Sequence, residues 1–213
     1  MDVLDSGLDL TAEDLKKKKD WEEVFQNKNP LVLDIGCGKG HFLADMASQN
    51  PDKNFLAIEI YKKGIRNTKK KIQRLQLTNV RIISLEARFI LLSFFHPGEI
   101  SEIHINFPDP WPKKRHWKRR IINPSFINIL HPLLGKEGRV HIATDFKGYV
   151  PVILKCFKEH PGFLNLYDPN GRGFVHELED RTESLYERKF REKNLTIYYF
   201  TFIKRETGER TDD

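Results

Sequence analysis

A short apolar run followed by a glycine-rich turn constrains the fold of this chain more than any other feature of its sequence. Residues 31–35 have the length and apolar character of a buried strand, and glycines stand at positions 36, 38 and 40. A helical pattern follows directly, over residues 40–49. Because glycine permits a tight turn and a close approach of the backbone, this arrangement is typical of ligand sites at the carboxyl edge of a parallel sheet.

Alternating strand and helix patterns continue along the rest of the chain. Six further strands are predicted from short apolar runs, over residues 55–60, 80–85, 102–107, 138–144, 163–167 and 195–203. Helices are predicted from longer periodic patterns, over residues 62–75, 124–134 and 149–159. Such alternation implies a parallel sheet covered by helices on both faces and connected by right-handed crossovers. We therefore predict a doubly wound, Rossmann-like α/β fold with a mostly parallel sheet of seven strands.

The length of 213 residues suits one domain with a single substantial core. We place that domain at residues 31–204, after a polar, partly helical extension over residues 1–30. In the extension, Thr11 and Asp14 resemble a capping box that opens a short helix carrying the lysine run 16–19. A charged tail, residues 205–213, closes the sequence.

The composition favours a polyanionic partner and a reducing compartment. The net charge is +6, the isoelectric point is about 9.2, and the basic residues cluster instead of being scattered. The two cysteines, Cys37 and Cys156, offer no disulfide framework, and the eight histidines lack metal-site spacing. No signal pattern opens the sequence, and the longest apolar run, residues 89–95, is too short to span a bilayer. We therefore expect a cytoplasmic protein without a bound metal.

The acids around the glycine turn indicate which ligand it holds. The spacing is Gly-x-Gly-x-Gly and Asp34 precedes it, whereas dinucleotide enzymes use Gly-x-Gly-x-x-Gly. A carboxylate there repels a pyrophosphate but pairs with the amino group of a methionine moiety, which favours S-adenosyl-L-methionine over NAD. Glu59 stands where an acid binds ribose hydroxyls in such folds, and Glu86 could approach the adenine edge. Gly36 and Gly38 would bring the backbone against the cofactor. The alternative is a structural turn with two surface acids.

The loop after the fourth strand joins an acid to a dense run of basic residues. Asp109 lies within Asn-Phe-Pro-Asp-Pro-Trp-Pro, where three prolines stiffen the chain at the carboxyl edge of the sheet. Residues 113–120 then carry six fixed positive charges, which indicates a stretch that tracks phosphates. Trp111 or Trp117 could stack on an unpaired base. The residues expected to contact RNA are Lys114, Arg115, His116, Trp117, Lys118 and Arg119.

Charge runs have a simpler interpretation as solvated loops or targeting signals. We prefer RNA contact for residues 113–120 because the run is attached to a rigid acidic motif at the expected catalytic edge. The predicted helix over residues 62–74 either widens the positive surface or only faces solvent. The basic residues that would widen this surface are Lys63, Arg66, Lys69, Lys70 and Lys71.

Several segments together resemble the tRNA (guanine-N7)-methyltransferase family, particularly its single-subunit bacterial form. The segments are residues 34–40, Glu59, 107–120, 144–145 and 184–190. The most specific part is Phe-Pro-Asp-Pro-Trp-Pro-Lys-Lys-Arg-His, and the resemblance covers roughly residues 31–204. It implies an enzyme that uses S-adenosyl-L-methionine to form N7-methylguanine in tRNA, at the variable loop.

The resemblance also implies roles for single residues. Positions that contact the cofactor in the family are occupied in this sequence by Asp34, Glu59, Glu86 and Asp109. Positions that contact the RNA substrate are occupied by Lys113, Asp145, Ser184, Leu185, Tyr186 and Glu187. Three of these residues differ from the commonest ones while keeping the functional group: Asp34 replaces Glu, Ser184 replaces Thr, and Glu86 replaces Asp.

Asp109 is the expected catalytic residue. Guanine N7 has an in-plane lone pair and no proton, so its attack on a sulfonium methyl needs alignment more than a general base. A fixed carboxylate can stabilise the positive charge that develops in the guanine ring, or can position cofactor and base.

Two other functions remain open from the sequence. One is methylation of an adenine amino group, although residues 106–109 depart from the Asn-Pro-Pro-Tyr motif of such enzymes. The other is an inactive RNA-binding module on the same fold. The expected partner is tRNA, without a membrane or an obligatory protein partner, and both a monomer and a homodimer are compatible with the sequence.

Overall fold

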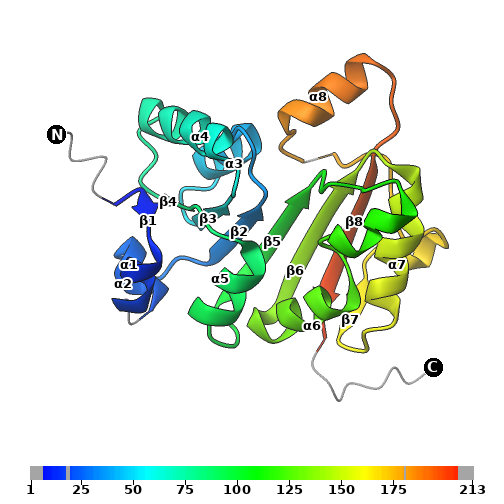
Figure 1. Ribbon diagram of the computed structural model, residues 1–213, viewed down its shortest axis with the longest axis horizontal. Coiled ribbons are helices and arrows are strands. Elements are labelled where there is room, and N and C mark those ends of the chain that lie inside the picture. Colours follow the sequence, from blue (N-terminus) through cyan, green and yellow to red (C-terminus); the bar gives the residue numbers. More distant parts are fainter. Residues whose placement is uncertain (1–6, 18–19, 180, 206–213) are drawn as a thin grey trace.

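The computed structural model describes residues 7–17, 20–179 and 181–205, with Asn170 and Leu185 described by their backbone alone. Within that part of the chain, one sheet of eight strands has the order β1-β4-β3-β2-β5-β6-β8-β7 (Figure 1). The strands are β1 (Asp9–Leu10), β2 (Leu31–Ile35), β3 (Asn54–Ile58), β4 (Val80–Ile83), β5 (Ile100–Asn106), β6 (Leu134–Thr144), β7 (Phe163–Asn165) and β8 (Tyr198–Lys204). Neighbouring strands are parallel, except that β8 is antiparallel to β6 and β7. The predicted α/β fold class is confirmed, with one strand more than predicted.

Helices cover both faces of the sheet (Figure 1). They are α1 (Ala12–Lys17), α2 (Trp21–Phe25), α3 (His41–Gln49), α4 (Lys62–Arg74), α5 (Ala87–Phe94), α6 (Pro124–Leu133), α7 (Val150–Lys158) and α8 (Leu185–Glu192). On one face, α3 and α4 bury Leu43 and Ile65 against the sheet. On the other face, α5, α6 and α7 bury Ile90, Ile127 and Ile153 in the larger core. These periodic apolar positions explain why the helices pack against the two faces of the sheet.

Three helices that the apolar pattern did not predict, α2, α5 and α8, begin at side-chain caps. Glu86 caps α5 by accepting a hydrogen bond from the Phe89 N–H at 2.9 Å, although glutamate is not a favoured residue at this position. In α8, Ser184 and Glu187 form a capping box. The Ser-x-x-Glu spacing was therefore the sequence signal that could have identified the charged helix α8.

The described part of the expected N-terminal extension packs on the sheet and the core. β1 pairs with β4 at one edge of the sheet. The predicted capping box is present, since the Thr11 N–H donates to Asp14 Oδ2 at 2.8 Å and the Asp14 N–H donates to Thr11 Oγ1 at 3.2 Å. Four apolar side chains of this segment are buried: Leu8, Leu15, Trp21 and Phe25. Residues 18–19 of the lysine run and 206–213 of the tail lie outside the described residues.

The register of the sheet places a row of polar side chains on the face that carries α3. Asp34 of β2 is aligned with His104 of β5, His104 with His141 of β6, and His141 with Thr201 of β8. Aligned residues of neighbouring strands point to the same face of a sheet. The row therefore connects the glycine turn to the carboxyl-terminal strand. Among the described helices, none is long and apolar enough to cross a membrane.

Candidate active site

The glycine turn leaves β2 with the predicted acid at its base. Asp34 is only 3% exposed, and burial, together with the neighbouring charge of Glu59, raises the pKa of Asp34 to about 7, against a lowering effect of Arg181. Gly36 and Gly38 have φ angles of 81° and 57°, a region that side chains disfavour. The turn therefore combines an open backbone with a buried carboxyl group that lacks full compensation for its charge.

Helix α4 packs closely against this turn. A Cβ atom on Gly40 would lie 2.5 Å from the side chain of Thr68, and one on Gly64 would collide with the carbonyl oxygen of Gly38. The Thr68 hydroxyl also donates to the Gly38 carbonyl at 3.3 Å. Two glycines are thus required by the approach of α4 to the turn, independently of any ligand.

Glu59 follows β3 and orients the turn from the side. Its Oε2 atom accepts a hydrogen bond from the Gly38 N–H at 2.9 Å, and its Oε1 atom accepts from the N–H groups of Ile60 and Tyr61 at 2.7 and 2.8 Å. The carboxylate thus lies at the carboxyl edge beside the glycines, as predicted.

Glu86 is exposed at the start of α5, where it caps the helix. It also lines a hollow of about 590 Å³ together with Ile121 and with residues 117–120 of the basic run 113–120, which we call the basic loop. The structure therefore brings this acid next to the basic loop, a neighbour that the sequence did not predict.

The loop that carries Asp109 has a strained backbone. Phe107 and Trp111 have φ angles of 51° and 41°, a conformation that costs non-glycine residues of order 1–3 kcal/mol each. The Phe107 N–H donates to the Ala143 carbonyl at 2.8 Å, which continues the pairing of β5 with β6 beyond the end of the strand. Asp109 itself is exposed. The surrounding structure thus fixes an unusual backbone on both sides of an accessible carboxylate.

Arg120 holds this loop from the inside. It is 4% exposed, and its guanidinium lies 4.8 Å from the ring centre of Trp117 and 4.9 Å from that of Tyr149. It donates from Nε to the Pro110 carbonyl at 2.7 Å and from Nη2 to the Trp111 carbonyl at 3.4 Å. One of the six charges of the basic run is therefore a structural brace for the Asp109 loop.

Four of the other basic residues of the run lie within a 3₁₀ helix, η1 (Lys114–Arg119), instead of a plain loop. The exposed cations are Lys113, Lys114, Arg115, Lys118 and Arg119, while His116 is half-buried. Trp111 is half-buried beneath Arg119, whose guanidinium lies 4.9 Å from the ring centre. Trp117 is 46% exposed and has Arg120 against its ring. Of the two candidate stacking rings, Trp117 is the more accessible.

The start of α8 is tied to the end of β5. Glu187 is fully buried, and its carboxylate accepts hydrogen bonds from the Ser184 N–H at 2.5 Å and from Arg181 Nε at 2.6 Å. Arg181 donates in turn to the side chain of Asn106, the last residue of β5. The side chains of Ser184 and Glu187 are thus occupied within the fold, where they shape the segment.

Two of the residues expected to contact substrate remain accessible near this segment. Tyr186 is 58% exposed, with its ring centre 5.9 Å from that of Phe107 at the start of the Asp109 loop. Asp145 is exposed directly after β6. Leu185, whose side chain lies outside the described part, is the first residue of α8.

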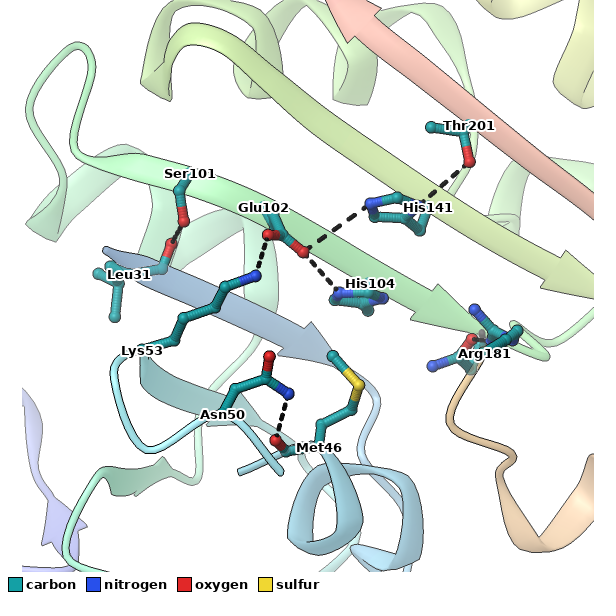
Figure 2. Close-up of polar contacts among 11 residues, drawn as sticks. Leu31, Met46, Asn50, Lys53, Ser101, Glu102, His104, His141, Arg181 and Thr201 are labelled. Carbon is teal, nitrogen blue, oxygen red and sulfur yellow. Dashed lines mark hydrogen bonds and ion pairs between the residues drawn. The ribbon is translucent and has the colours of Figure 1, made fainter. Parts of the chain in front are cut away.

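Sequence reasoning missed a buried polar cluster on the α3 face of the sheet (Figure 2). Glu102 Oε2 lies 3.4 Å from Nε2 of His104 and 3.9 Å from Nε2 of His141, and the two imidazole rings stack at 4.7 Å. Lys53 donates to Glu102 Oε1 at 2.7 Å, and His141 Nδ1 lies 3.1 Å from the Thr201 hydroxyl. Only the strand register brings these residues together, since His141 is far from the other two in sequence.

The cluster has the donor types of a divalent metal site, with ligand atoms within 4.8 Å of one another. Burial is the main cause that lowers the pKa of His104 and also that of His141, the latter to about 3, and it favours the neutral form of both rings. Glu102 already has a cationic partner in Lys53.

Comparison with known proteins shows similarity to methyltransferases in sequence and in fold. A family model described as "Putative methyltransferase" matches residues 28–200. A tRNA (guanine-N(7)-)-methyltransferase from Geobacter metallireducens is 38% identical over 93% of both chains, and one from Listeria innocua is 38% identical over 87% of this chain and 85% of its own. Two solved structures share the fold. An rRNA methylase from Streptococcus thermophilus (TM-score 0.57, 14% identity) covers 89% of this chain and 99% of its own. A SAM-dependent O-methyltransferase from Thermotoga maritima (TM-score 0.56, 16% identity) covers 94% of this chain and 68% of its own.

Proposed function

As this chain belongs to the tRNA (guanine-N7-)-methyltransferase family, we propose that it transfers the methyl group of S-adenosyl-L-methionine to N7 of a guanine in tRNA. The observation that carries this proposal is the pairing of β2 with β5, which sets the glycine turn beside the loop of Asp109. The variable-loop guanine is the proposed target, and the two free cysteines suit action in the cytoplasm.

The residues of the turn fit the cofactor. A Cβ atom on Gly36 would meet nothing within 4 Å, so the backbone there is open to a ligand. Asp34 is a buried carboxyl group with a raised pKa, and the ammonium of a methionine moiety would supply the positive charge that stabilises its ionised form. Glu59 stands at the same edge, where a carboxylate can accept hydrogen bonds from ribose hydroxyls. S-adenosyl-L-methionine supplies an electrophilic methyl group.

Methyl transfer to N7 requires that the protein align the two reactants and stabilise the charge that develops on the guanine ring. Guanine N7 attacks the methyl carbon with its in-plane lone pair, and the electrons of the old carbon–sulfur bond remain on sulfur. Positive charge thereby moves onto the guanine ring, where the Asp109 carboxylate can stabilise it. The strained backbone at Phe107 and Trp111 and the brace of Arg120 hold this carboxylate in place before the base arrives.

The RNA-facing residues surround that position. The exposed cations of the basic loop can neutralise backbone phosphates, with Lys113 nearest in sequence to Asp109. Tyr186 offers an accessible ring, and Asp145 can accept from the N1 and N2 hydrogens of guanine. Arg181, through Glu187 and Asn106, keeps the segment of Tyr186 beside the catalytic loop.

Incubation with labelled S-adenosyl-L-methionine and unmodified tRNA, followed by nucleoside analysis, tests the proposal. We expect the label in N7-methylguanosine. Label in a methyladenosine would instead identify an adenine methyltransferase. Binding of tRNA without any transfer would identify an inactive RNA-binding module.

A further inference from the structure

A second concentration of positive charge lies away from the basic loop, in a hollow of about 520 Å³ between α3, α4 and α8. We refer to it as the α4 hollow. Five basic side chains and one acid account for its charge: Lys39, Lys70, Lys71, Arg74, Arg188 and Asp45. Because a concave surface with this excess of one sign focuses its field, it favours an anionic ligand.

The single acid leaves most of this charge without compensation. Asp45 pairs with Arg188 at 2.8 Å, and this ion pair joins α3 to α8. Within the described residues, Lys39, Lys70, Lys71 and Arg74 form no ion pair. Burial, followed by the charges of Lys71 and Arg188, lowers the pKa of His41 on the same wall, as expected beside positive charge.

Lys71 is the strongest indication that the hollow accepts an anion. Its ammonium nitrogen is shielded from solvent, and no described group accepts a hydrogen bond from it. Desolvation first, and then the charges of Arg74 and Arg188, lower its pKa to about 8, against a raising effect of Asp45. An ammonium has three donors, and a buried polar group without a partner is costly. An anion in the hollow would satisfy these donors. By contrast, Lys69 on the same helix pairs with Asp9.

The hollow adjoins the segments that the proposed function uses. Lys39 belongs to the glycine turn, and Arg188 follows Glu187 directly in α8. The Thr182 hydroxyl also donates to Gln49 of α3 at 2.7 Å, so the chain leading into α8 lies against the helix that forms one wall. Figure 1 shows α8 near α3 and α4 above the sheet.

We propose that the α4 hollow binds a backbone phosphate of the RNA substrate. This inference rests on the proposed function for the identity of the RNA. Arginine recognises phosphate through paired hydrogen bonds and lysine through a point charge, and the hollow offers both. RNA held at the hollow and at the basic loop would be fixed at two points. Helix α8 lies close to both, since Arg188 lines the hollow and the ring centre of Tyr186 lies 5.9 Å from that of Phe107.

Lys71→Met tests this inference, because it removes a buried ammonium without a partner and keeps the length of the side chain. Binding of unmodified tRNA is measured over a series of salt concentrations. The expected result is an affinity threefold to tenfold weaker, with the slope of log affinity against log salt reduced by about one. At saturating tRNA the turnover number should be unchanged. The control Lys69→Gln, which removes a charge from α4 outside the hollow, should change affinity less than twofold.

Three outcomes would overturn the inference. One is unchanged tRNA affinity and salt dependence in Lys71→Met, and another is an equal loss in both variants. The third concerns inorganic phosphate as a probe in thermal unfolding. If phosphate stabilises the wild type but not Lys71→Met while tRNA affinity is equal, the hollow is a site for a free anion.

Failure of the proposed function can be distinguished from failure of this inference. A wild-type chain that binds tRNA but methylates none refutes the proposed activity, while the affinity comparison still decides the role of the hollow. A wild-type chain that binds no RNA refutes both.

Discussion

Asp109 is an exposed carboxylate held between two residues with left-handed backbone conformations. We expect Asp109→Ala to lower the turnover number by at least about 100-fold, because removal of one fixed group that stabilises transition-state charge typically costs that much. Affinity for tRNA should change little, since the basic loop is intact. Single-turnover methyl transfer and filter binding measure the two effects. An Asp109→Ala enzyme with near-normal activity would exclude the assigned role.

Asp34 makes the cofactor-free protein sensitive to pH. Its pKa of about 7 in the folded state lies above the ordinary value of 3.8, so the stability linked to its proton is lost as the pH rises through 7. Asp34→Asn should therefore raise the free energy of unfolding at pH 8 by on the order of 1–4 kcal/mol. The advantage should grow between about pH 4 and pH 7 and then level off. Urea unfolding of both proteins measures it, and parallel pH profiles would contradict it.

The same residue predicts the opposite effect on ligand binding. An ammonium ligand needs the ionised carboxylate, so the affinity of the wild type for S-adenosyl-L-methionine should rise with pH up to about 7. Asp34→Asn should bind the cofactor weakly at every pH. Calorimetric titration of both proteins with S-adenosyl-L-methionine measures the effect. If Asp34 had a purely structural role, both proteins would bind the cofactor equally well.

At the scale of the element, the basic loop combines exposed cations with one buried cation, Arg120. Replacing the exposed Lys113, Arg115 and Arg119 by alanine should weaken tRNA binding and reduce the salt slope by roughly two to three. Thermal stability should be nearly unchanged. Binding that is insensitive to these substitutions at every salt concentration would refute the role of the loop.

Arg120 provides the contrast within the same loop. Arg120→Ala should cost on the order of 2–4 kcal/mol of stability, because it leaves the Pro110 carbonyl without its donor and separates two rings from a cation. The salt slope of tRNA binding should stay close to that of the wild type. Equal changes in stability and in salt slope for Arg120→Ala and the triple variant would contradict the assignment of Arg120 to structure and of the exposed cations to RNA binding.

At the scale of the whole molecule, residues before β2 contribute to the core. Trp21 is 6% exposed and stacks on Phe95 at 4.8 Å. Trp21→Ala should lower the free energy of unfolding by about 3–5 kcal/mol, as deletions of large buried side chains do. The half-exposed Trp117 is the control, and Trp117→Ala should cost no more than about 1–2 kcal/mol, because it loses only the contact of its ring with Arg120. Similar small effects in both variants would mean that the segment is dispensable for folding.

Local patterns accounted for much of the fold and for part of the site. The strand before the glycine turn, the helices α4, α6 and α7 and the position of the Asp109 loop were predictable, because periodicity and turn chemistry involve near neighbours in sequence. The helix α5 was not predicted because its N-cap is Glu86, a residue type that does not normally signal the start of a helix. The strand β1 has only two residues and is too short to show a pattern.

The sequence by itself determined the alternation of strands and helices, the open turn at Gly36 and Gly38, and the position of Asp109 beside the basic loop. Each of these depends on residues that are close together in the chain. The tertiary structure alone decided which charges are free. It turned Arg120 inward and buried Glu187 against Arg181. It also gathered the α4 hollow from three helices. The physical reason is that burial and charge compensation depend on side chains brought together by strand register and helix packing, and neither can be read from local sequence.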